Sequence, residues 1–161
     1  MRVSVLTVSD RCSRGQAEDK SGPLLSELLK ETAETVCYRC VPDEREQIAA
    51  ALVFMCDELQ SDVVFTTGGT GFAPRDVTPE ATRDVIEKEV PGIPEAIRYE
   101  SLQITPKAML SRATAGIRGR TLIVNLPGSP KAVRESLSVV LPVLDHAIET
   151  MSGQTLSCGK D

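Results

Sequence analysis

Short apolar runs alternate along the chain with stretches in which apolar residues recur at helical spacing. The runs are rich in β-branched residues and predict strands at residues 2–9, 35–41, 63–67, 113–118 and 121–125. The stretches between them predict helices at about residues 21–29, 44–59, 78–89, 94–103 and 130–148. Because crossover helices must cover both faces of a sheet, this alternation predicts a three-layer α/β/α fold with a mainly parallel central sheet.

Local signals refine the ends of these helices. Ser21 and Thr78 are candidate N-cap residues, each followed closely by a proline that the first helical turn tolerates. Residues 11–20 are polar and predict a loop. Pro142 lies inside the last helix, where it removes a backbone donor and predicts a kink.

Length and charge exclude several classes of protein. The 161 residues suffice for one domain, which we assign to residues 1–151 and follow with a flexible tail at residues 152–161. No apolar run approaches the roughly 18 residues needed to span a bilayer, and the first residues resemble a strand rather than a signal peptide. We therefore expect a cytoplasmic protein with no membrane partner. The net charge of −5 argues against nucleic-acid binding, which depends on a basic face.

The cysteines and the single histidine offer little chemistry. The five cysteines are an odd number spread along the chain, so reduced thiols are expected. Cys37 and Cys40 have the spacing of a metal or redox pair, but they fall in a predicted strand, where residues three apart point to opposite faces. His146 lies on the last predicted helix, away from the strand ends, which favours a surface role over catalysis.

The most informative segment runs from Thr66 to Glu80 and joins a strand to a helix through a glycine-rich turn. In Thr67-Gly68-Gly69-Thr70-Gly71 the glycines permit positive φ, so successive amide N–H groups can converge on a phosphate, and the two threonines add hydroxyl donors. Asp76 follows closely enough to hold a divalent cation on the same phosphate. The spacing fits neither the P-loop nor the dinucleotide fingerprint. The alternative is a mobile turn without a ligand.

Other polar residues fall at the same predicted edge of the sheet. Ligands of parallel sheets bind at the carboxyl ends of the strands. This rule gathers along one edge Asp10, Asp43, the turn at residues 67–76 and the turn at residues 125–129. Three aspartates at such an edge indicate a magnesium and phosphate site. Two simpler alternatives are that Asp43 only caps a helix and that Asp76 only pairs with the neighbouring Arg75.

Two further segments are candidates for substrate contact. Pro127-Gly128-Ser129 precedes a helix, whose first N–H groups suit a second anionic group. Ser111 and Arg112 combine a hydroxyl with a cation that can grip a phosphate or a pterin-type acceptor, with an ordinary exposed loop as the alternative. Two anion sites indicate two phosphorylated substrates. Transfer between them needs positioning and charge neutralisation rather than a protein nucleophile.

Several separated motifs extend over most of the chain, from Arg2 to Met151. They include Leu6-Thr7-Val8-Ser9-Asp10, Val41-Pro42-Asp43-Glu44, the uninterrupted segment from Thr66 to Thr82, Met109-Leu110-Ser111-Arg112 and Asn125-Leu126-Pro127-Gly128-Ser129. Together they resemble the molybdopterin adenylyltransferases, the family of bacterial MogA and of the G domains of gephyrin and plant Cnx proteins.

The resemblance implies a MogA-like fold, usually a trimer, and transfer of AMP from ATP to molybdopterin with release of pyrophosphate. It implies Mg²⁺ as the ion and a transient contact with the molybdenum insertase. By position, Asp43 and Asp76 correspond to the essential acidic residues, in catalytic and metal-binding roles. The residues that correspond to substrate contacts are Asp10, Thr67, Gly68, Gly69, Thr70, Gly71, Arg75, Ser111, Asn125, Pro127, Gly128 and Ser129.

Two other functions are the alternatives. A non-catalytic molybdopterin-binding or scaffold module would bind the pterin without turnover. A nucleotide pyrophosphatase of related fold would release product without a pterin acceptor. The retained acidic residues argue against a purely scaffolding role.

Overall fold

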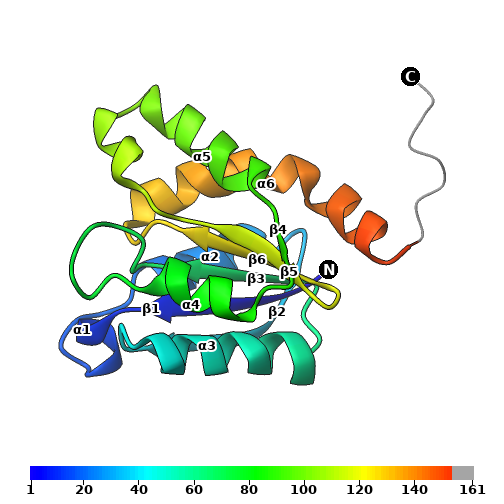
Figure 1. Ribbon diagram of the computed structural model, residues 1–161, viewed down its shortest axis with the longest axis horizontal. Helices are drawn as coiled ribbons and strands as arrows, with labels where there is room; N and C mark the ends of the chain where they lie inside the picture. The colour runs from blue at the N-terminus through cyan, green and yellow to red at the C-terminus, as the bar shows by residue number, and fades with distance from the viewer. Residues whose placement is uncertain (154–161) are drawn as a thin grey trace.

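The computed structural model describes residues 1–153 and contains one six-stranded sheet in the order β2-β1-β3-β6-β5-β4 (Figure 1). The strands are β1 (Arg2–Val8), β2 (Glu34–Val41), β3 (Val63–Thr67), β4 (Lys88–Glu89), β5 (Ala115–Arg118) and β6 (Thr121–Leu126). β1, β2, β3 and β6 are parallel, and β5 and β4 extend the sheet in antiparallel pairing. The expected mainly parallel sheet is confirmed.

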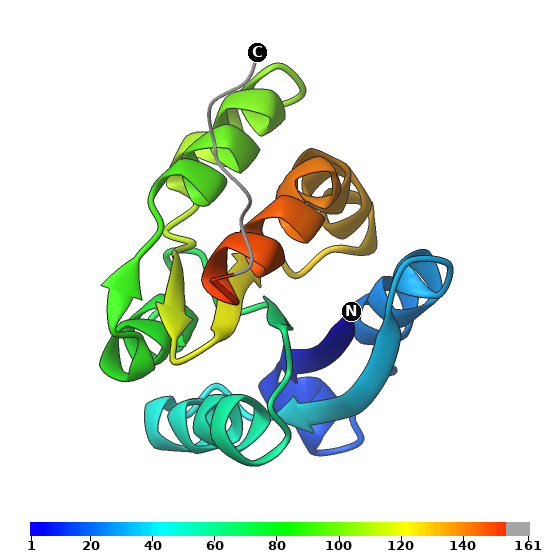
Figure 2. The same cartoon turned by 90° about the vertical axis from the view of Figure 1, so that its right-hand side faces the viewer.

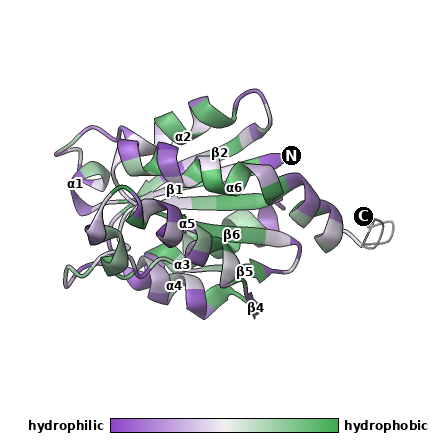
Figure 3. Ribbon diagram, turned by 90° about the horizontal axis from the view of Figure 1, so that it is seen from above, coloured by the Kyte–Doolittle hydropathy of each residue, from purple (hydrophilic) through white to green (hydrophobic). Residues whose placement is uncertain are grey.

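Helices cover both faces of this sheet (Figures 1 and 2). On one face pack α2 (Ser21–Leu29), α5 (Gly92–Leu102) and α6 (Pro130–Met151), and on the other pack α3 (Arg45–Val53) and α4 (Thr78–Val85). Val5 and Phe65 belong to the first core, whereas Leu6 and Val64 belong to the second, because neighbouring residues of a strand face opposite sides. Figure 3 shows the resulting apolar central strands. The three-layer α/β/α prediction is confirmed.

The central parallel strands end level with one another. Thr7 of β1 pairs with Thr67 of β3, and Thr67 pairs in turn with Leu126 of β6. Every residue of β3 and β6 is buried, so these two strands lie at the centre of the packed core. The loops that follow these strands therefore begin at the same edge of the sheet.

The helix after the glycine turn is shorter than its sequence predicts. α4 ends at Val85 instead of continuing to residue 89. The N–H of Glu87 donates to the carbonyl of Ile117 (2.8 Å), and the N–H of Val90 donates to that of Ala115 (2.9 Å). The segment after Val85 therefore forms the short edge strand β4, because pairing with β5 outweighs its local helical pattern.

Three short elements differ from the sequence prediction. α1 (Asp10–Ser13) occupies the start of the segment expected as a loop, and the hydroxyl of Ser9 accepts a hydrogen bond from the N–H of Cys12. A 3₁₀ turn, η2 (Pro106–Leu110), follows α5. The last part of the predicted helix 44–59 is a π-helical turn, η1 (Phe54–Glu58). Short helices of this kind give too little periodicity to be recognised in a sequence.

Neither predicted N-cap residue caps its helix. Ser21 and Thr78 are the first residues of α2 and α4, and their hydroxyls donate to backbone carbonyls of other loops. The N-terminus of α2 is capped instead by Asp19, whose carboxylate accepts hydrogen bonds from the N–H groups of Ser21 (2.9 Å) and Gly22 (3.1 Å). Both hydroxyls therefore stabilise loops.

Helix α6 is continuous through Pro142 from Pro130 to Met151. Of the predicted tail, residues 154–161 lie outside the described residues. Within residues 1–153, no helix is long and apolar enough to span a bilayer.

Candidate active site

Loops after β1, β2, β3 and β6 converge at the carboxyl edge of the sheet, on the left of Figure 1. The turn after β3 lies between its neighbours, because the N–H of Gly68 donates to the carbonyl of Leu126 (3.3 Å). The loop after β1 is joined to β2, because the N–H of Ser9 donates to the carbonyl of Val41 (2.9 Å). The predicted convergence of these segments is confirmed.

Gly68 permits the close packing of this turn. Its φ is +99°, and a Cβ at this position would lie 2.3 Å from the carbonyl oxygen of Val8. A Cβ on Gly128 would in turn lie 3.3 Å from the Cα of Gly68. The turns after β3 and β6 thus touch through backbone atoms, which leaves their N–H and C=O groups close to any ligand.

Hydroxyl groups fasten these turns to one another. Thr67 donates to the carbonyl of Pro127 (2.8 Å), Thr78 donates to that of Gly68 (2.9 Å), and Ser21 donates to that of Gly128 (2.7 Å). The hydroxyl proton of Thr67, expected to face a ligand, is therefore used inside the protein. A turn held by hydrogen bonds from three elements does not fit the alternative of a mobile turn.

Asp10 and Asp43 join the first two loops through a reciprocal contact. The carboxylate of Asp43 accepts a hydrogen bond from the N–H of Asp10 (2.8 Å), and the carboxylate of Asp10 accepts one from the N–H of Asp43 (3.2 Å). Each aspartate therefore satisfies a backbone donor in the other loop. Asp43 does not cap α3, because the N-cap residue of that helix is Glu44, whose own side chain makes no capping hydrogen bond.

Arg75 reaches across to this pair from the loop after β3. Its guanidinium donates to both carboxylate oxygens of Asp10 (2.9 Å each) and to Glu44 (2.8 Å). The bidentate contact with Arg75 lowers the pKa of Asp10. The ion pairs of Arg75 thus involve Asp10 and Glu44, and not the adjacent Asp76 as the simpler alternative proposed. Sequence reasoning did not single out Glu44.

Asp43 lies in a more negative environment than Asp10. Partial burial raises the pKa of Asp43, and the charges of Asp10 and Asp76 raise it further. The hydrogen bond from the backbone of Asp10 and the charge of Arg75 oppose this rise without cancelling it. A bound cation would relieve the remaining repulsion between the carboxylates.

Asp76 folds back toward the glycine turn. Its Oδ2 accepts a hydrogen bond from the N–H of Ala73 (3.0 Å), and a Cβ on Gly71 would lie 2.9 Å from the same oxygen. Within residues 1–153, no group of three or more His, Cys, Asp or Glu residues is arranged as a metal site. Asp43 and Asp76 nevertheless carry oxygen ligands of the kind that Mg²⁺ takes, because this ion commonly binds through one or two carboxylates together with substrate phosphates and water.

Arg112 holds the acidic loop in place. Its guanidinium donates to the carbonyls of Gly71 (2.7 Å) and Asp76 (2.6 Å) and pairs with Glu80 at the start of α4. Its own N–H donates to the carbonyl of Thr70 (2.9 Å). These contacts use all three nitrogens of the guanidinium inside the protein, which favours a supporting role for Arg112 over the expected grip on a phosphate. Glu80, the partner of Arg112, is the acidic residue in the first turn of α4.

Asn125 is also an internal residue. Its side chain is fully buried, and its amide group donates to the hydroxyls of Thr66 (3.0 Å) and Thr82 (2.9 Å). Its carbonyl oxygen accepts a hydrogen bond from the N–H of Thr114 (3.2 Å). The side chain thus joins β6 to β3 and α4 beneath the site. We correct its expected role from substrate contact to structural support.

Two cavities lie on either side of the glycine turn. One, of about 270 Å³, is mainly apolar and lies between α5, η2 and α6, with Thr70, Gly71, Ser111 and Pro127 in its wall. The other, of about 310 Å³, is lined by polar residues of the loop after β1 together with Thr67, Gly68 and Gly128. Seven of the predicted site residues therefore line one or other of these two cavities. The predicted residues that line neither are Asp10, Asp43, Gly69, Arg75, Asp76, Asn125 and Ser129.

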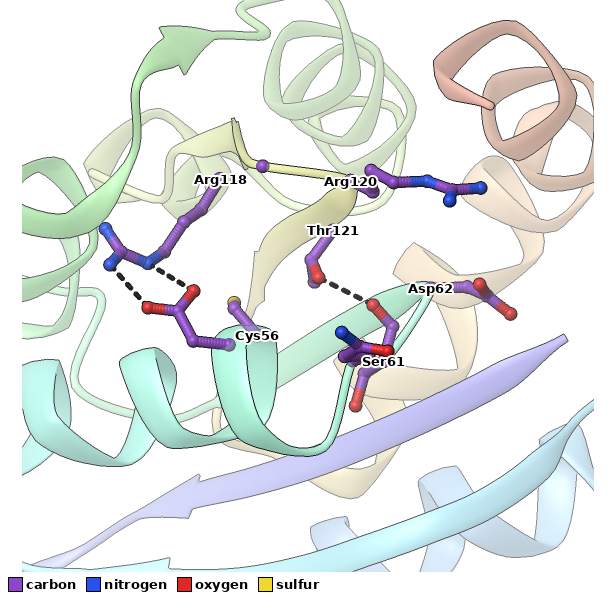
Figure 4. A pocket seen from close by; sticks show the side chains of 9 residues that line it. Cys56, Ser61, Asp62, Arg118, Arg120 and Thr121 are labelled. Carbon is purple, nitrogen blue, oxygen red and sulfur yellow. Dashed lines mark hydrogen bonds and ion pairs between the residues drawn. The ribbon is translucent and has the colours of Figure 1, made fainter. Parts of the chain in front are cut away.

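A larger cavity, of about 510 Å³, lies at the opposite end of the sheet (Figure 4). Its wall includes Arg118 and Arg120, but Arg118 donates to both carboxylate oxygens of Asp57 (2.9 and 2.6 Å) and extends away from Arg120. No residue predicted for the site lines it. Size alone therefore does not identify the active site.

The remaining candidate residues lie outside the site. Cys37 and Cys40 are on β2, and they are free thiols like Cys12 and Cys56 of the described chain. His146 is exposed on α6. These positions agree with the limited chemistry expected of them.

The comparisons with known proteins agree with this geometry. Residues 4–146 match the family model described as "Probable molybdopterin binding domain". The chain is 47% identical over 156 residues to the molybdopterin adenylyltransferase of Helicobacter pylori J99, covering 95% of this chain and 89% of that protein. It is 46% identical over 166 residues to gephyrin of Dictyostelium discoideum, covering 96% of this chain and 23% of that protein.

A solved structure shows the same relationship. The molybdopterin biosynthesis enzyme MoaB from Thermus thermophilus is 50% identical and superposes with a TM-score of 0.89, covering 94% of this chain and 96% of that chain. Fold and sequence therefore agree, and the chain belongs to the molybdopterin-binding domain family of molybdenum cofactor biosynthesis.

Proposed function

We propose that this protein is a molybdopterin adenylyltransferase, which transfers AMP from ATP to molybdopterin and releases pyrophosphate. The observation that carries the proposal is the pair of cavities on either side of the glycine turn, one lined mainly by polar residues and one mainly apolar, with Asp43 and Asp76 next to that turn. Joining a nucleotide to a heterocyclic acceptor requires two such compartments with a common wall. The 47% identical relative carries the same activity in its name.

The polar cavity suits the nucleotide. The N–H of Gly68 is already bonded to Leu126, so Gly128 supplies the backbone N–H there, and Lys20 adds a positive charge near the N-terminus of α2. Asp19 already caps the first two N–H groups of α2, so the glycine turns and Lys20 have to supply most of the contacts to phosphate.

The apolar cavity suits the pterin. Its walls include Ile97, Ala113 and Pro127, while Arg98 and Lys107 supply cationic groups. Arg98 also donates to the carbonyl of Ala113 (2.9 Å). Flat apolar walls with a few polar groups are typical of sites for heterocyclic ligands.

The chain itself supplies positioning rather than a nucleophile. Asp43 and Asp76 would hold Mg²⁺, which neutralises phosphate charge and orients the reacting groups when bound. An oxygen of the pterin substrate forms a bond to the α-phosphorus of ATP as the bond to the pyrophosphate oxygen breaks. Arg112 keeps Asp76 in place, and Arg75 keeps Asp10 beside Asp43. Such preorganisation is the main catalytic requirement of phosphoryl-type transfer.

Pyrophosphate release from purified protein with ATP, Mg²⁺ and molybdopterin tests the proposal. We expect product only when all three are present, and loss of product when EDTA removes the metal. Turnover without the pterin would overturn the proposal in favour of a nucleotide pyrophosphatase. Saturable pterin binding without turnover would favour a scaffold module.

We also propose a homotrimer that acts in the cytoplasm and contacts the molybdenum insertase transiently. Large apolar side chains are exposed on α5, on η2 and in the turn between them, and they support self-association; they are Tyr99, Leu102, Ile104, Met109 and Leu110. Light scattering on the purified chain tests the trimer. A monomeric mass at micromolar concentration would overturn it.

A further inference from the structure

Ser136 on α6 has a buried hydroxyl for which residues 1–153 supply no hydrogen-bond partner. The residue is 1% exposed, and its Oγ bonds to no other group of the described chain. It lies between the buried residues Val133 and Leu137 on the inner face of the helix. An unsatisfied hydroxyl in such a position lowers the stability of the free protein. A bound ligand that forms a hydrogen bond with this hydroxyl would explain why it is present.

Other hydroxyls nearby are satisfied. Ser138, two residues further along α6, donates to the carbonyl of Glu135 (2.7 Å). Thr150 on the same helix donates to the carbonyl of His146 (2.8 Å). Bonding to the preceding turn is a common solution for Ser and Thr in helices. Ser136 differs from both residues because it lines the apolar cavity of about 270 Å³.

The surroundings of Ser136 within that cavity are mostly apolar. Ile97 of α5, Ala108 of η2 and Ala132 of α6 contribute to the same wall. The cations of the cavity belong to Arg98 and Lys107, on α5 and η2. A neutral hydroxyl set among apolar groups suits an uncharged heteroatom, whereas a phosphate is better matched by a cation.

We propose that Ser136 is a binding residue of the acceptor cavity, where its hydroxyl forms a hydrogen bond with a ring heteroatom of the pterin. The inference rests on the proposed function, which places the pterin in this cavity. Pterin rings carry uncharged nitrogen and carbonyl groups, and a hydroxyl can donate to them or accept from them. The nucleotide lies beyond the glycine turn, so Ser136 acts on the acceptor alone.

This arrangement gives Ser136→Ala two opposite effects. In the free protein the substitution removes an unsatisfied hydroxyl, so the melting temperature should rise by about 2–4 °C. In the complex it removes one neutral hydrogen bond, so molybdopterin should bind about threefold to tenfold more weakly. A purely structural serine would not show a gain in stability together with a loss of affinity.

The test measures molybdopterin binding under anaerobic conditions without ATP, and then steady-state transfer with the full chain. Ser138→Ala is the matched control, because it deletes a hydroxyl from the exposed side of the same helix. We expect Ser136→Ala to raise the Kd and KM for molybdopterin together and to leave kcat and the KM for ATP unchanged. Ser138→Ala should leave all four quantities unchanged.

Pterin affinity equal to that of the wild type, or a lower melting temperature, would overturn the role of Ser136. The proposed function fails separately, since it would be overturned by a wild-type protein that does not transfer AMP. Active wild type with an indistinguishable Ser136→Ala variant would overturn only the inference about Ser136.

Discussion

Asp10 and Asp43 each accept a hydrogen bond from the backbone N–H of the other, at 3.2 and 2.8 Å. This exchange fixes two loops that follow different strands and uses one oxygen of each carboxylate. Asp10 is then neutralised by Arg75, whereas Asp43 is held beside Asp76 with a raised pKa. On the proposed function, Asp10 is therefore the supporting aspartate, and Asp43 and Asp76 are the pair that would hold the cation.

Asp76→Ala should lower transfer by at least about 100-fold, the usual cost of removing a group that stabilises transition-state charge. The carboxylate accepts one loop hydrogen bond, from Ala73, so the melting temperature should stay within about 3 °C of the wild type. Asp84→Ala is the control, since Asp84 pairs with Arg45 on the surface. Full activity in Asp76→Ala, or an unfolded variant, would contradict the assigned role.

Gly68→Ala should destabilise the protein more than Gly119→Ala does. Both glycines have positive φ, so either substitution carries a left-handed penalty of about 1–2 kcal/mol. Only at position 68 would the new Cβ meet backbone, 2.3 Å from the carbonyl oxygen of Val8, whereas position 119 has no neighbour within 4 Å. Urea unfolding and transfer assays measure the difference. Equal stability of the two variants would show that close packing at Gly68 is unimportant.

Arg112→Lys should reduce stability by about 1–3 kcal/mol and lower transfer as well. A lysine ammonium lacks the planar fork that reaches Gly71, Asp76 and Glu80 together. Arg83→Lys is the matched control, because Arg83 contacts the same Glu80 from the surface at 4.0 Å. The proposal that Arg112 orients the acidic loop would be withdrawn if both variants behaved alike.

The pair formed by Asp57 and Arg118 should contribute to stability at neutral pH but not in strong acid. The contact with Arg118 lowers the pKa of Asp57 below its ordinary value of about 4. Its contribution is therefore present above the unfolded-state pKa and is lost as the pH falls through the folded-state pKa. Urea midpoints of the wild type and Asp57→Asn should differ at pH 6 and converge near pH 2. Asp145→Asn, at an exposed position of α6, is the control.

The central strands and their common edge could be predicted because their signals are local. β3 was predicted with its observed ends, since Val63 to Thr67 is a continuous buried run that stops at glycine. The convergence of four loops followed from the rule for parallel sheets and needed no side-chain coordinates.

The missed features depend on partners that are distant in sequence. α4 stops at Val85 because the following residues pair with β5, and a helical pattern contains no information about that pairing. Asn125 and Arg112 looked like ligand contacts because both are polar and close to the site. Asn125 is fully buried, and Arg112 pairs with Glu80, which lies 32 residues away in the sequence; neither fact can be read from the local pattern.

The parallel pairing of β3 with β6 brings together residues as far apart as Thr66 and Asn125, 59 positions along the chain. Closing such a long loop is slow, because the chain loses conformational entropy before the stabilising contacts between the two strands can form. The glycine turn and Arg112 both lie within this loop. During refolding, helix content should therefore recover before substrate binding does, and a nascent chain acquires a working site only after β6 has been synthesised.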